Sequence, residues 1–156
     1  MGNGSEEYLV RGALIACSCG SHPRRLNLPQ CHGVYALDHP VIHENDCVVG
    51  DNISYFGVCL GETPPSGAEE ILLDAYVPEG QESTGEEVQG PRCAPEIIGG
   101  WNSVKESTKV SGEARAATTS SYLVCRCGGI LFPVTSGQEY EDKGGGSFWD
   151  QVRSKI

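Results

Sequence analysis

Large apolar side chains are scarce in this sequence. Its 156 residues include 1 methionine, 2 tryptophans and 3 phenylalanines, whereas glycine occurs 21 times and proline 9 times. Glycine and proline interrupt helices, so this composition favours turns joined by short strands. We therefore expect one small all-β domain with a lean hydrophobic core.

Long apolar runs are also absent. No stretch approaches the roughly 20 apolar residues that a membrane-spanning helix needs. The segment from Met1 to Val10 carries Glu6 and Glu7 and lacks the apolar centre of a signal peptide. We therefore expect a protein that is made and folded in the cytoplasm, without classical export and without stable membrane anchoring.

Positive charge is in short supply as well. The chain has 11 lysines and arginines against 21 acidic residues, which gives a formal net charge of −10 at pH 7. This balance disfavours binding to nucleic acid or to an anionic membrane surface. It suits solubility or a basic partner.

Residues 60–90 contain no lysine or arginine, and prolines interrupt them. We interpret this region as an exposed, partly mobile acidic loop inserted into the domain, and a solvated insertion is favoured over a docking surface. Residues 69–77 suit either a short helix or an edge strand. The acidic residues are Glu62, Glu69, Glu70, Asp74, Glu79, Glu82, Glu86 and Glu87.

Sequence signatures of catalysis are missing. There is no Gly-x-Ser-x-Gly elbow, no His-Glu-x-x-His and no phosphate-binding loop. With eight cysteines and four histidines, neighbouring Cys and His residues arise by chance. We therefore predict that the protein is not an enzyme.

Cysteine, in contrast, is abundant, with 8 residues. A secreted protein would pair them as disulfides, whereas a cytosolic one would use them as metal ligands or keep them reduced. Because no signal peptide precedes the chain's first strand, metal ligation is favoured over reduced structural thiols and over disulfides.

Two Cys-x-Cys pairs near opposite ends of the chain are the most specific signal. Each pair follows a short apolar run and precedes a glycine. Residues i and i+2 of a strand share one face, so Cys17 and Cys19 would aim two sulfurs at one point, and Cys125 and Cys127 would do the same. Four thiolates from two strands would form a closed tetrahedral zinc site.

Two further groups of residues have the chemistry of metal ligands. Cys59 and Cys93 each lie beside a turn. A looser group occupies the first third of the chain, where a histidine near a hairpin is more often a surface side chain than a ligand. Its members are Cys31, His32, His39, His43 and Cys47.

The remaining pattern predicts short strands and tight turns. The segment Tyr8 to Cys17 reads as a strand bent at Gly12, and Tyr122 to Cys127 reads as a second strand. Between Cys31 and Cys59 we expect consecutive hairpins, with one turn at Asp38 to Pro40. The compact domain then covers residues 8–138, with 60–90 as its acidic insertion.

Residues 139–156 form a separate tail. Gly144 to Gly146 has the composition of a flexible joint. The segment from Ser147 to Ile156 would give a short helix with one apolar stripe. It reads either as a docking peptide or as a frayed terminus.

The order of several motifs resembles the PAAR-like proteins of bacterial type VI secretion and related contractile injection machines. The resemblance spans roughly Val10 to Gln138. It rests on Gly12, Ala13, Cys17, Gly20 and Ser21; on Asn52, Ile53, Phe56, Gly57 and Cys59; on Cys93, Pro95 and Trp101; and on Ser121, Cys125, Gly128, Gly129, Leu131, Gly137 and Gln138.

The resemblance implies a cone of short hairpins in a pseudo-threefold arrangement, with one structural zinc ion holding the strands at its apex. The family positions carried over are Cys17, Cys59, Cys93 and Cys125. Cys19 and Cys127 fall where many relatives have other residues. Two ligand sets therefore stay open, the four family positions and the two Cys-x-Cys pairs, together with mixtures of them.

The resemblance also implies a role. Such proteins cap and sharpen a trimeric VgrG-type spike, help it to puncture a membrane, and carry or recruit effectors or chaperones. The protein would be loaded in the cytoplasm and delivered by the machine outside the cell or into a target cell. The alternative is a zinc-binding adaptor that recruits an effector or other protein through the acidic loop or the C-terminal tail.

Overall fold

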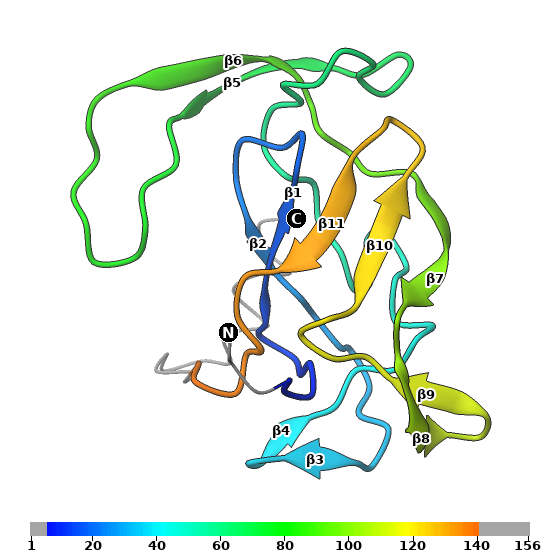
Figure 1. Ribbon diagram of the computed structural model, residues 1–156. Coiled ribbons are helices and arrows are strands. Elements are labelled where there is room, and N and C mark those ends of the chain that lie inside the picture. Colours follow the sequence, from blue (N-terminus) through cyan, green and yellow to red (C-terminus); the bar gives the residue numbers. More distant parts are fainter. Residues whose placement is uncertain (1–5, 141–156) are drawn as a thin grey trace.

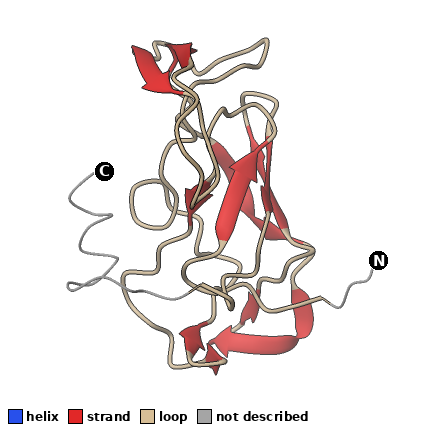
Figure 2. Cartoon of the chain, turned by 90° about the vertical axis from the view of Figure 1, so that its left-hand side faces the viewer, coloured by secondary structure: helices blue, strands red, loops and turns tan. Residues whose placement is uncertain are grey.

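The computed structural model describes residues 6–140, and this part of the chain consists of strands and turns without a helix (Figure 1, Figure 2). The predicted all-β class is thereby confirmed. Within the same range, no helix has the length and apolarity to cross a membrane. The strands are β1 (Leu14–Cys17), β2 (Arg24–Arg25), β3 (Tyr35–Ala36), β4 (His39–Pro40), β5 (Glu70–Asp74), β6 (Glu87–Pro91), β7 (Ile97–Asn102), β8 (Lys105–Ser111), β9 (Ala114–Ala116), β10 (Tyr122–Cys125) and β11 (Ile130–Pro133).

Five strands form a central antiparallel sheet in the order β2-β1-β11-β10-β7 (Figure 1). Side chains alternate between the faces of a strand, and the buried ones are Ile15 and Cys17 in β1 and Leu123 and Cys125 in β10. Leu131 of β11 is the register partner of both Cys17 and Leu123. The sheet therefore brings both cysteine-bearing ends of the chain to one inner face.

The second cysteine of each Cys-x-Cys pair lies outside the sheet. The chain turns directly after Cys17 and after Cys125, where the amides of Gly20 and Gly128 donate to these cysteines' carbonyls at 3.0 Å. Gly128 has a φ of 92°, which glycine adopts without steric cost. The prediction that each pair lies in one extended strand, with both sulfurs on one face, is therefore wrong.

Three distant segments meet in a closed ring of backbone hydrogen bonds. The amide of Leu9 donates to the carbonyl of Ala117, the amide of Ala117 to that of Ile42, and the amide of Ile42 to that of Leu9, each at 2.9 Å. All three residues are fully buried. The ring fixes the first, middle and last parts of the domain against one another.

Single β-bridges extend the ring on either side. Tyr8 pairs with Thr118, and Val10 pairs with Val41. Val10 and Val41 are also buried in a small apolar cluster next to the main core. The larger core cluster lies along the inner face of the central sheet and contains the buried cysteines.

The N-terminal strand is bent as expected. Gly12 has a φ of 99° in a turn that separates the bridges at Tyr8 and Val10 from β1. The segment Ile53 to Cys59 is not the strand that its composition suggests. It makes isolated β-bridges only, because Ile53, Val58 and Cys59 pair with three different segments of the chain.

The β3–β4 hairpin turns one residue earlier than predicted. Leu37 and Asp38 form the turn with φ values of 48° and 68°, and His39 and Pro40 already belong to the returning strand. Positive φ at both central residues matches the backbone twist of paired strands, and Asp tolerates it. Leu37 is 77% exposed at the hairpin tip.

The acidic region is a hairpin rather than a loop throughout. Strands β5 and β6 pair antiparallel from Glu70 opposite Pro91 to Asp74 opposite Glu87. Of the two alternatives for residues 69–77, the strand is confirmed and the helix is wrong. Figure 1 shows this hairpin across one end of the molecule, with the connecting residues 75–86 extending beyond it.

The connecting residues 75–86 are tied back to the domain at their base. The ring of His22 contacts Tyr76 edge-on at 5.9 Å and hydrogen-bonds the carbonyl of Asp74 at 2.8 Å. Arg25 forms an ion pair with Glu79 at 3.0 Å. The predicted glycine joint and docking peptide of the tail lie outside the described residues.

Candidate metal centres

Four buried cysteines gather in the main core. Cys17 and Cys125 end strands β1 and β10, Cys59 lies in an irregular segment, and Cys93 follows β6. Each is only 4–5% exposed, and all four belong to one core cluster. All eight cysteines of the chain are free thiols.

Backbone hydrogen bonds bring Cys59 and Cys93 to the strands. The amide of Cys59 donates to the carbonyl of Pro91 at 2.7 Å, and the amide of Cys93 donates to that of Gly57 at 2.8 Å. Cys59 also bridges Gly20, directly after the first Cys-x-Cys pair. These bonds join the segments of Cys17, Cys59 and Cys93, and strand β10 adds Cys125. The four positions that the family resemblance implies therefore lie in one core cluster.

A hydrogen bond couples two of these thiols. Cys93 donates to Cys17, which lowers the pKa of Cys17 to about 6, and the amides of Cys19 and Gly20 add to this effect. The same bond, with burial and the nearby sulfurs of Cys59 and Cys125, raises the pKa of Cys93. One negative charge is therefore already favoured within the group, as a metal-binding thiolate requires.

A backbone amide also points at the sulfur of Cys125. The amide of Glu96 donates to Cys125 Sγ at 3.4 Å. Cys17 and Cys125, at equivalent strand ends, thus share the same kind of polar support.

Two glycines leave space for the sulfurs. A Cβ on Gly129 would lie 2.8 Å from Cys17 Sγ, and a Cβ on Gly61 would lie 2.8 Å from Cys19 Sγ and 3.8 Å from Cys59 Sγ. Side chains at either position would displace thiols. Gly129 belongs to the resemblance motif, whereas Gly61 carries no sequence signal that marks it.

Cys19 and Cys127 form an outer pair around the buried four. Both are half-buried and contact the edge of the core cluster. Burial and the neighbouring Cys125 raise the pKa of Cys127 to about 11. Its sulfur also lies 3.8 Å from the Glu96 carboxylate, which disfavours a thiolate there.

The residue types of the buried group are those of a structural zinc site, because four cysteines can form a closed tetrahedral site. Among the described residues, however, the four sulfurs do not form a group whose ligand atoms all lie within 4.8 Å of one another. The space at Gly61 and Gly129 and the amide donors around the sulfurs fit the same chemistry.

A second group of metal-ligand side chains lies elsewhere. One ligand atom each of His32, His43 and Asp46 lies within 4.8 Å of the others, so this group could hold a metal ion. Two of its members, His32 and His43, belong to the looser group identified from the sequence, and Asp46 is the third. The spacing of Asp46, three residues after His43, is a usable signal that sequence reasoning interprets only as a turn.

The other members of the loose cluster make separate contacts. The thiol of Cys31 hydrogen-bonds the Tyr35 hydroxyl at 2.9 Å, and that of Cys47 lies 3.6 Å from the carbonyl of Gly99. His39 lies in β4 and is not part of the metal-ligand group.

Comparison with known proteins gives a family but no named relative. No curated protein and no solved structure matches the chain. One family model does match, from residue 9 at the hydrogen-bonded ring to residue 138, where the Gln138 side chain donates to the carbonyl of Tyr8 at 2.8 Å. The match takes in both candidate centres, and the chain belongs to this family, described as a domain of unknown function (DUF4280).

Proposed function

We propose that this protein is the tip of a contractile injection machine and caps a trimeric VgrG-type spike. The observation that carries the proposal is the closed ring formed by Leu9, Ile42 and Ala117. A single chain that seats on the end of a trimer must offer three similar segments to three identical subunits. A cyclic arrangement of three segments meets this requirement.

The cysteines give a second similarity among the three segments of the ring. Cys17 follows Leu9 by eight positions, and Cys125 follows Ala117 by eight positions. Cys59 follows Ile42 at a greater distance, so the middle segment carries an insertion. These three cysteines have the same exposure of 5%, and Cys93 is then the fourth thiol of the group.

Cys17, Cys59, Cys93 and Cys125 would hold the zinc ion of such a tip. A bound zinc ion would supply charge neutralisation and four strong bonds among strands that bury little apolar surface. The chain itself orients the ligands through the amides of Cys19, Gly20 and Glu96. Cys19 and Cys127 would remain outer thiols.

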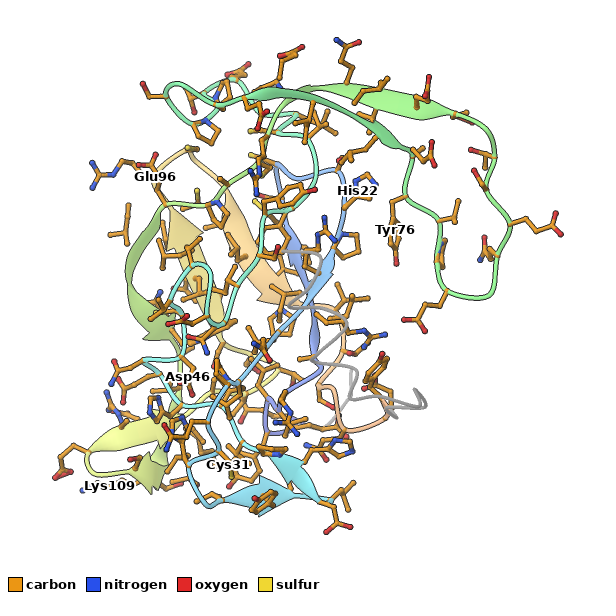
Figure 3. The ribbon with its side chains drawn as sticks, turned by 180° about the vertical axis from the view of Figure 1, so that it is seen from behind. His22, Cys31, Asp46, Tyr76, Glu96 and Lys109 are labelled. Atoms are coloured by element: carbon orange, nitrogen blue, oxygen red, sulfur yellow. The ribbon has the colours of Figure 1, made fainter. Side chains whose placement is uncertain are left out.

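We assign spike binding to the end of the molecule that carries the ring of Leu9, Ile42 and Ala117, which we call the ring end. Figure 3 shows Glu96, beside the thiol group, toward the opposite end from Asp46 and Cys31. The β3–β4 hairpin exposes Tyr35 (57%) and Leu37 (77%) at the ring end. Exposed apolar residues of this kind are typical of docking surfaces.

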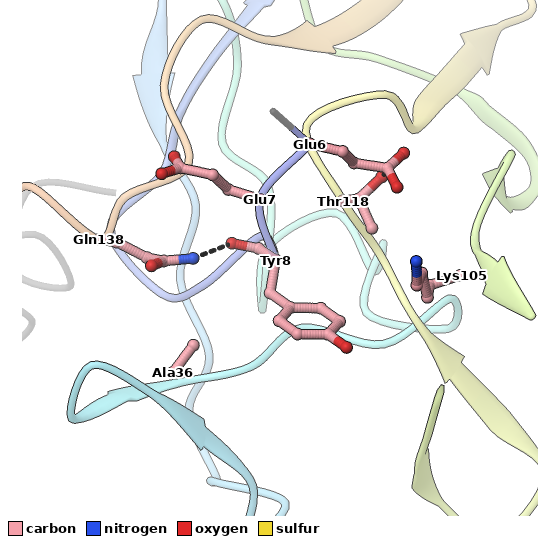
Figure 4. Close-up of a pocket in the computed structure, with 7 residues that line it drawn as sticks. All are labelled: Glu6, Glu7, Tyr8, Ala36, Lys105, Thr118 and Gln138. Carbon is pink, nitrogen blue, oxygen red and sulfur yellow. Dashed lines mark hydrogen bonds between the residues drawn. The ribbon is translucent and has the colours of Figure 1, made fainter. Parts of the chain in front are cut away.

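An open hollow of about 300 Å³ lies at the same end (Figure 4). Hydrogen bonds from Ser120 and Thr118 lower the pKa of the Glu6 carboxyl, so the hollow holds a negative charge. It offers a socket for a polar or basic side chain of the spike. The lining residues are Glu6, Glu7, Tyr8, Ala36, Lys105, Thr118 and Gln138.

Co-expression with the spike protein of the same cell tests the proposal. Native mass spectrometry of the purified complex is expected to show one copy of this chain per spike trimer. Recovery of the spike trimer without this chain, at micromolar concentrations of both, would overturn it.

The β5–β6 hairpin supports a second candidate, an adaptor that recruits an effector. It exposes Leu72 (55%) and Tyr76 (41%) among acidic residues, at the end opposite the ring. Replacing residues 75–86 with a two-residue turn separates the candidates. The adaptor would lose its partner, whereas the tip would still cap the spike.

A further inference from the structure

The side chains of His32, His43 and Asp46 converge on one point. His32 Nε2 lies 2.8 Å from Asp46 Oδ2, and His43 Nδ1 lies 3.4 Å from the same oxygen. The two imidazole rings stack with centroids 4.0 Å apart and an interplanar angle of 14°. Two nitrogen donors and one oxygen donor are therefore side by side, in a group separate from the thiols.

The Asp46 carboxylate is held in place by its surroundings. The amide of His43 donates to Asp46 Oδ2 at 2.8 Å, and the Asp46 amide donates to the carbonyl of His43 at 3.0 Å. The indole N–H of Trp101 donates to the Asp46 carbonyl at 3.0 Å. Side chains with fixed orientations lose little entropy when they bind a ligand.

We propose that His32, His43 and Asp46 bind one zinc ion. Imidazole nitrogen and carboxylate oxygen are common zinc ligands at about 2.0–2.2 Å, so ligand atoms of a tetrahedral site lie roughly 3.3 Å apart. The separations of 2.8 and 3.4 Å lie on either side of this value. A bound ion would replace the hydrogen bond between His32 and Asp46 and the one that His43 Nδ1 accepts from the Asn45 amide at 3.1 Å. With three protein ligands, a water molecule would complete a four-coordinate site, and the His32 side chain is 18% exposed to solvent.

Zinc at this position joins two parts of the fold. His43 bridges Ala116 next to the hydrogen-bonded ring, whereas His32 belongs to the segment before β3. A shared ion fixes the β3–β4 hairpin's leading segment to the ring. This inference stands apart from the proposed function, since it needs neither a spike nor the thiol group.

Nitrogen-15 labelling of the histidine rings tests the site directly, because the chain has only four histidines. Zinc is added to the full-length protein until the thiols are saturated, and the titration then continues. The ring signals of His32 and His43 are expected to shift together and to saturate with one further ion. Those of His22 and His39 are expected to stay unchanged.

Calorimetry on variants gives the second measurement. His32→Gln is expected to weaken this zinc binding by at least about tenfold, and Asp46→Asn, which preserves size and hydrogen-bonding capacity, is expected to do likewise. His39→Gln is the matched control and should bind as the wild type does. Unchanged His32 and His43 signals at millimolar zinc, shifts at His22 or His39 instead, or wild-type affinity in Asp46→Asn would each overturn the proposal.

Discussion

The thiols of Cys17 and Cys93 share a hydrogen bond although 76 positions separate them in the sequence (93 − 17). One sulfur comes from the first strand of the central sheet, and the other follows the acidic hairpin. Their contact joins these two parts of the chain within the thiol group.

Cys17→Ser and Cys93→Ser are each expected to lose the metal ion of the thiol group, whereas Cys19→Ser is expected to retain it. The ion proposed at His32, His43 and Asp46 should remain in all three variants. Each buried substitution should also lower the free energy of unfolding by at least about 2 kcal/mol, because a ligand is lost and a hydroxyl is left poorly satisfied. Elemental mass spectrometry gives the metal content, and urea denaturation gives the stability.

Cys47→Ser serves as the matched control, since Cys47 is half-buried and contacts the Gly99 carbonyl. It should keep its metal. Loss of metal from Cys19→Ser but not from Cys93→Ser would point instead to the two Cys-x-Cys pairs as ligands.

Gly129→Ala and Gly61→Ala form a second test of the ligand set. The new methyl group of Gly129→Ala would lie 2.8 Å from Cys17 Sγ, and that of Gly61→Ala equally close to Cys19 Sγ. Cys17 is buried and has no room to move, whereas half-buried Cys19 can rotate toward solvent.

Gly129→Ala is therefore expected to lose the metal ion of the thiol group and some stability, and Gly61→Ala to keep that ion. Metal content and melting temperature of the two proteins, measured side by side, check this. Equal metal content in both would show that Cys17 does not hold a fixed ligand position.

Acid should weaken the contact between Glu44 and Arg115. Hydrogen bonds from Arg115 lower the pKa of the Glu44 carboxyl, so the charged form is stabilised in the folded state. This stability is present above the ordinary carboxyl pKa of about 4.5 and is lost as pH falls through the lowered value.

The difference in unfolding free energy between wild type and Glu44→Gln is thus expected to be largest near pH 7 and to shrink toward pH 3. Urea titrations at several pH values measure it. Glu113→Gln is the control, because Glu113 is highly exposed and pairs with Lys109 at the surface. A pH-independent difference for Glu44→Gln would contradict the assignment.

Leu37→Lys should distinguish the two proposed functions. The substitution places a charge on the exposed tip of the β3–β4 hairpin, so spike binding is expected to weaken by at least about tenfold with little change in melting temperature. Leu72→Lys makes the same change on the β5–β6 hairpin and should leave spike binding intact. The opposite pattern in a binding titration would favour the adaptor.

The sequence is informative about the class of fold, whereas it leaves two sets of cysteines open as metal ligands. Glycine and proline content indicates short strands, and the apolar runs before Cys17 and Cys125 correctly locate β1 and β10. These signals depend on neighbouring residues alone, so a single sequence is enough to recognise them. The ring of Leu9, Ile42 and Ala117 could not be predicted, because it consists of backbone hydrogen bonds that place no constraint on residue type.

The wrong and missing predictions each have a physical reason. Cys19 and Cys127 fall in turns that strand periodicity ignores, and Gly128 after Cys127 has a φ of 92° there. The acidic region has the sequence character of a loop because β6 carries one large apolar residue among Glu, Gln, Gly and Pro, so the partner strand of the apolar run in β5 is hard to recognise. The spacing of Asp46 three residues after His43 is a signal that is easily passed over, because a carboxylate in a turn has many ordinary roles.

The ring also has a consequence for how the protein is made. Leu9, Ile42 and Ala117 are 33 and 75 positions apart (42 − 9 and 117 − 42), and each needs the other two. A nascent chain therefore leaves the Leu9 amide and the Ile42 carbonyl without partners until Ala117 has emerged from the ribosome. Such long sequence separations between contacting residues slow folding, so the domain should fold late, nearly whole, rather than piece by piece during synthesis.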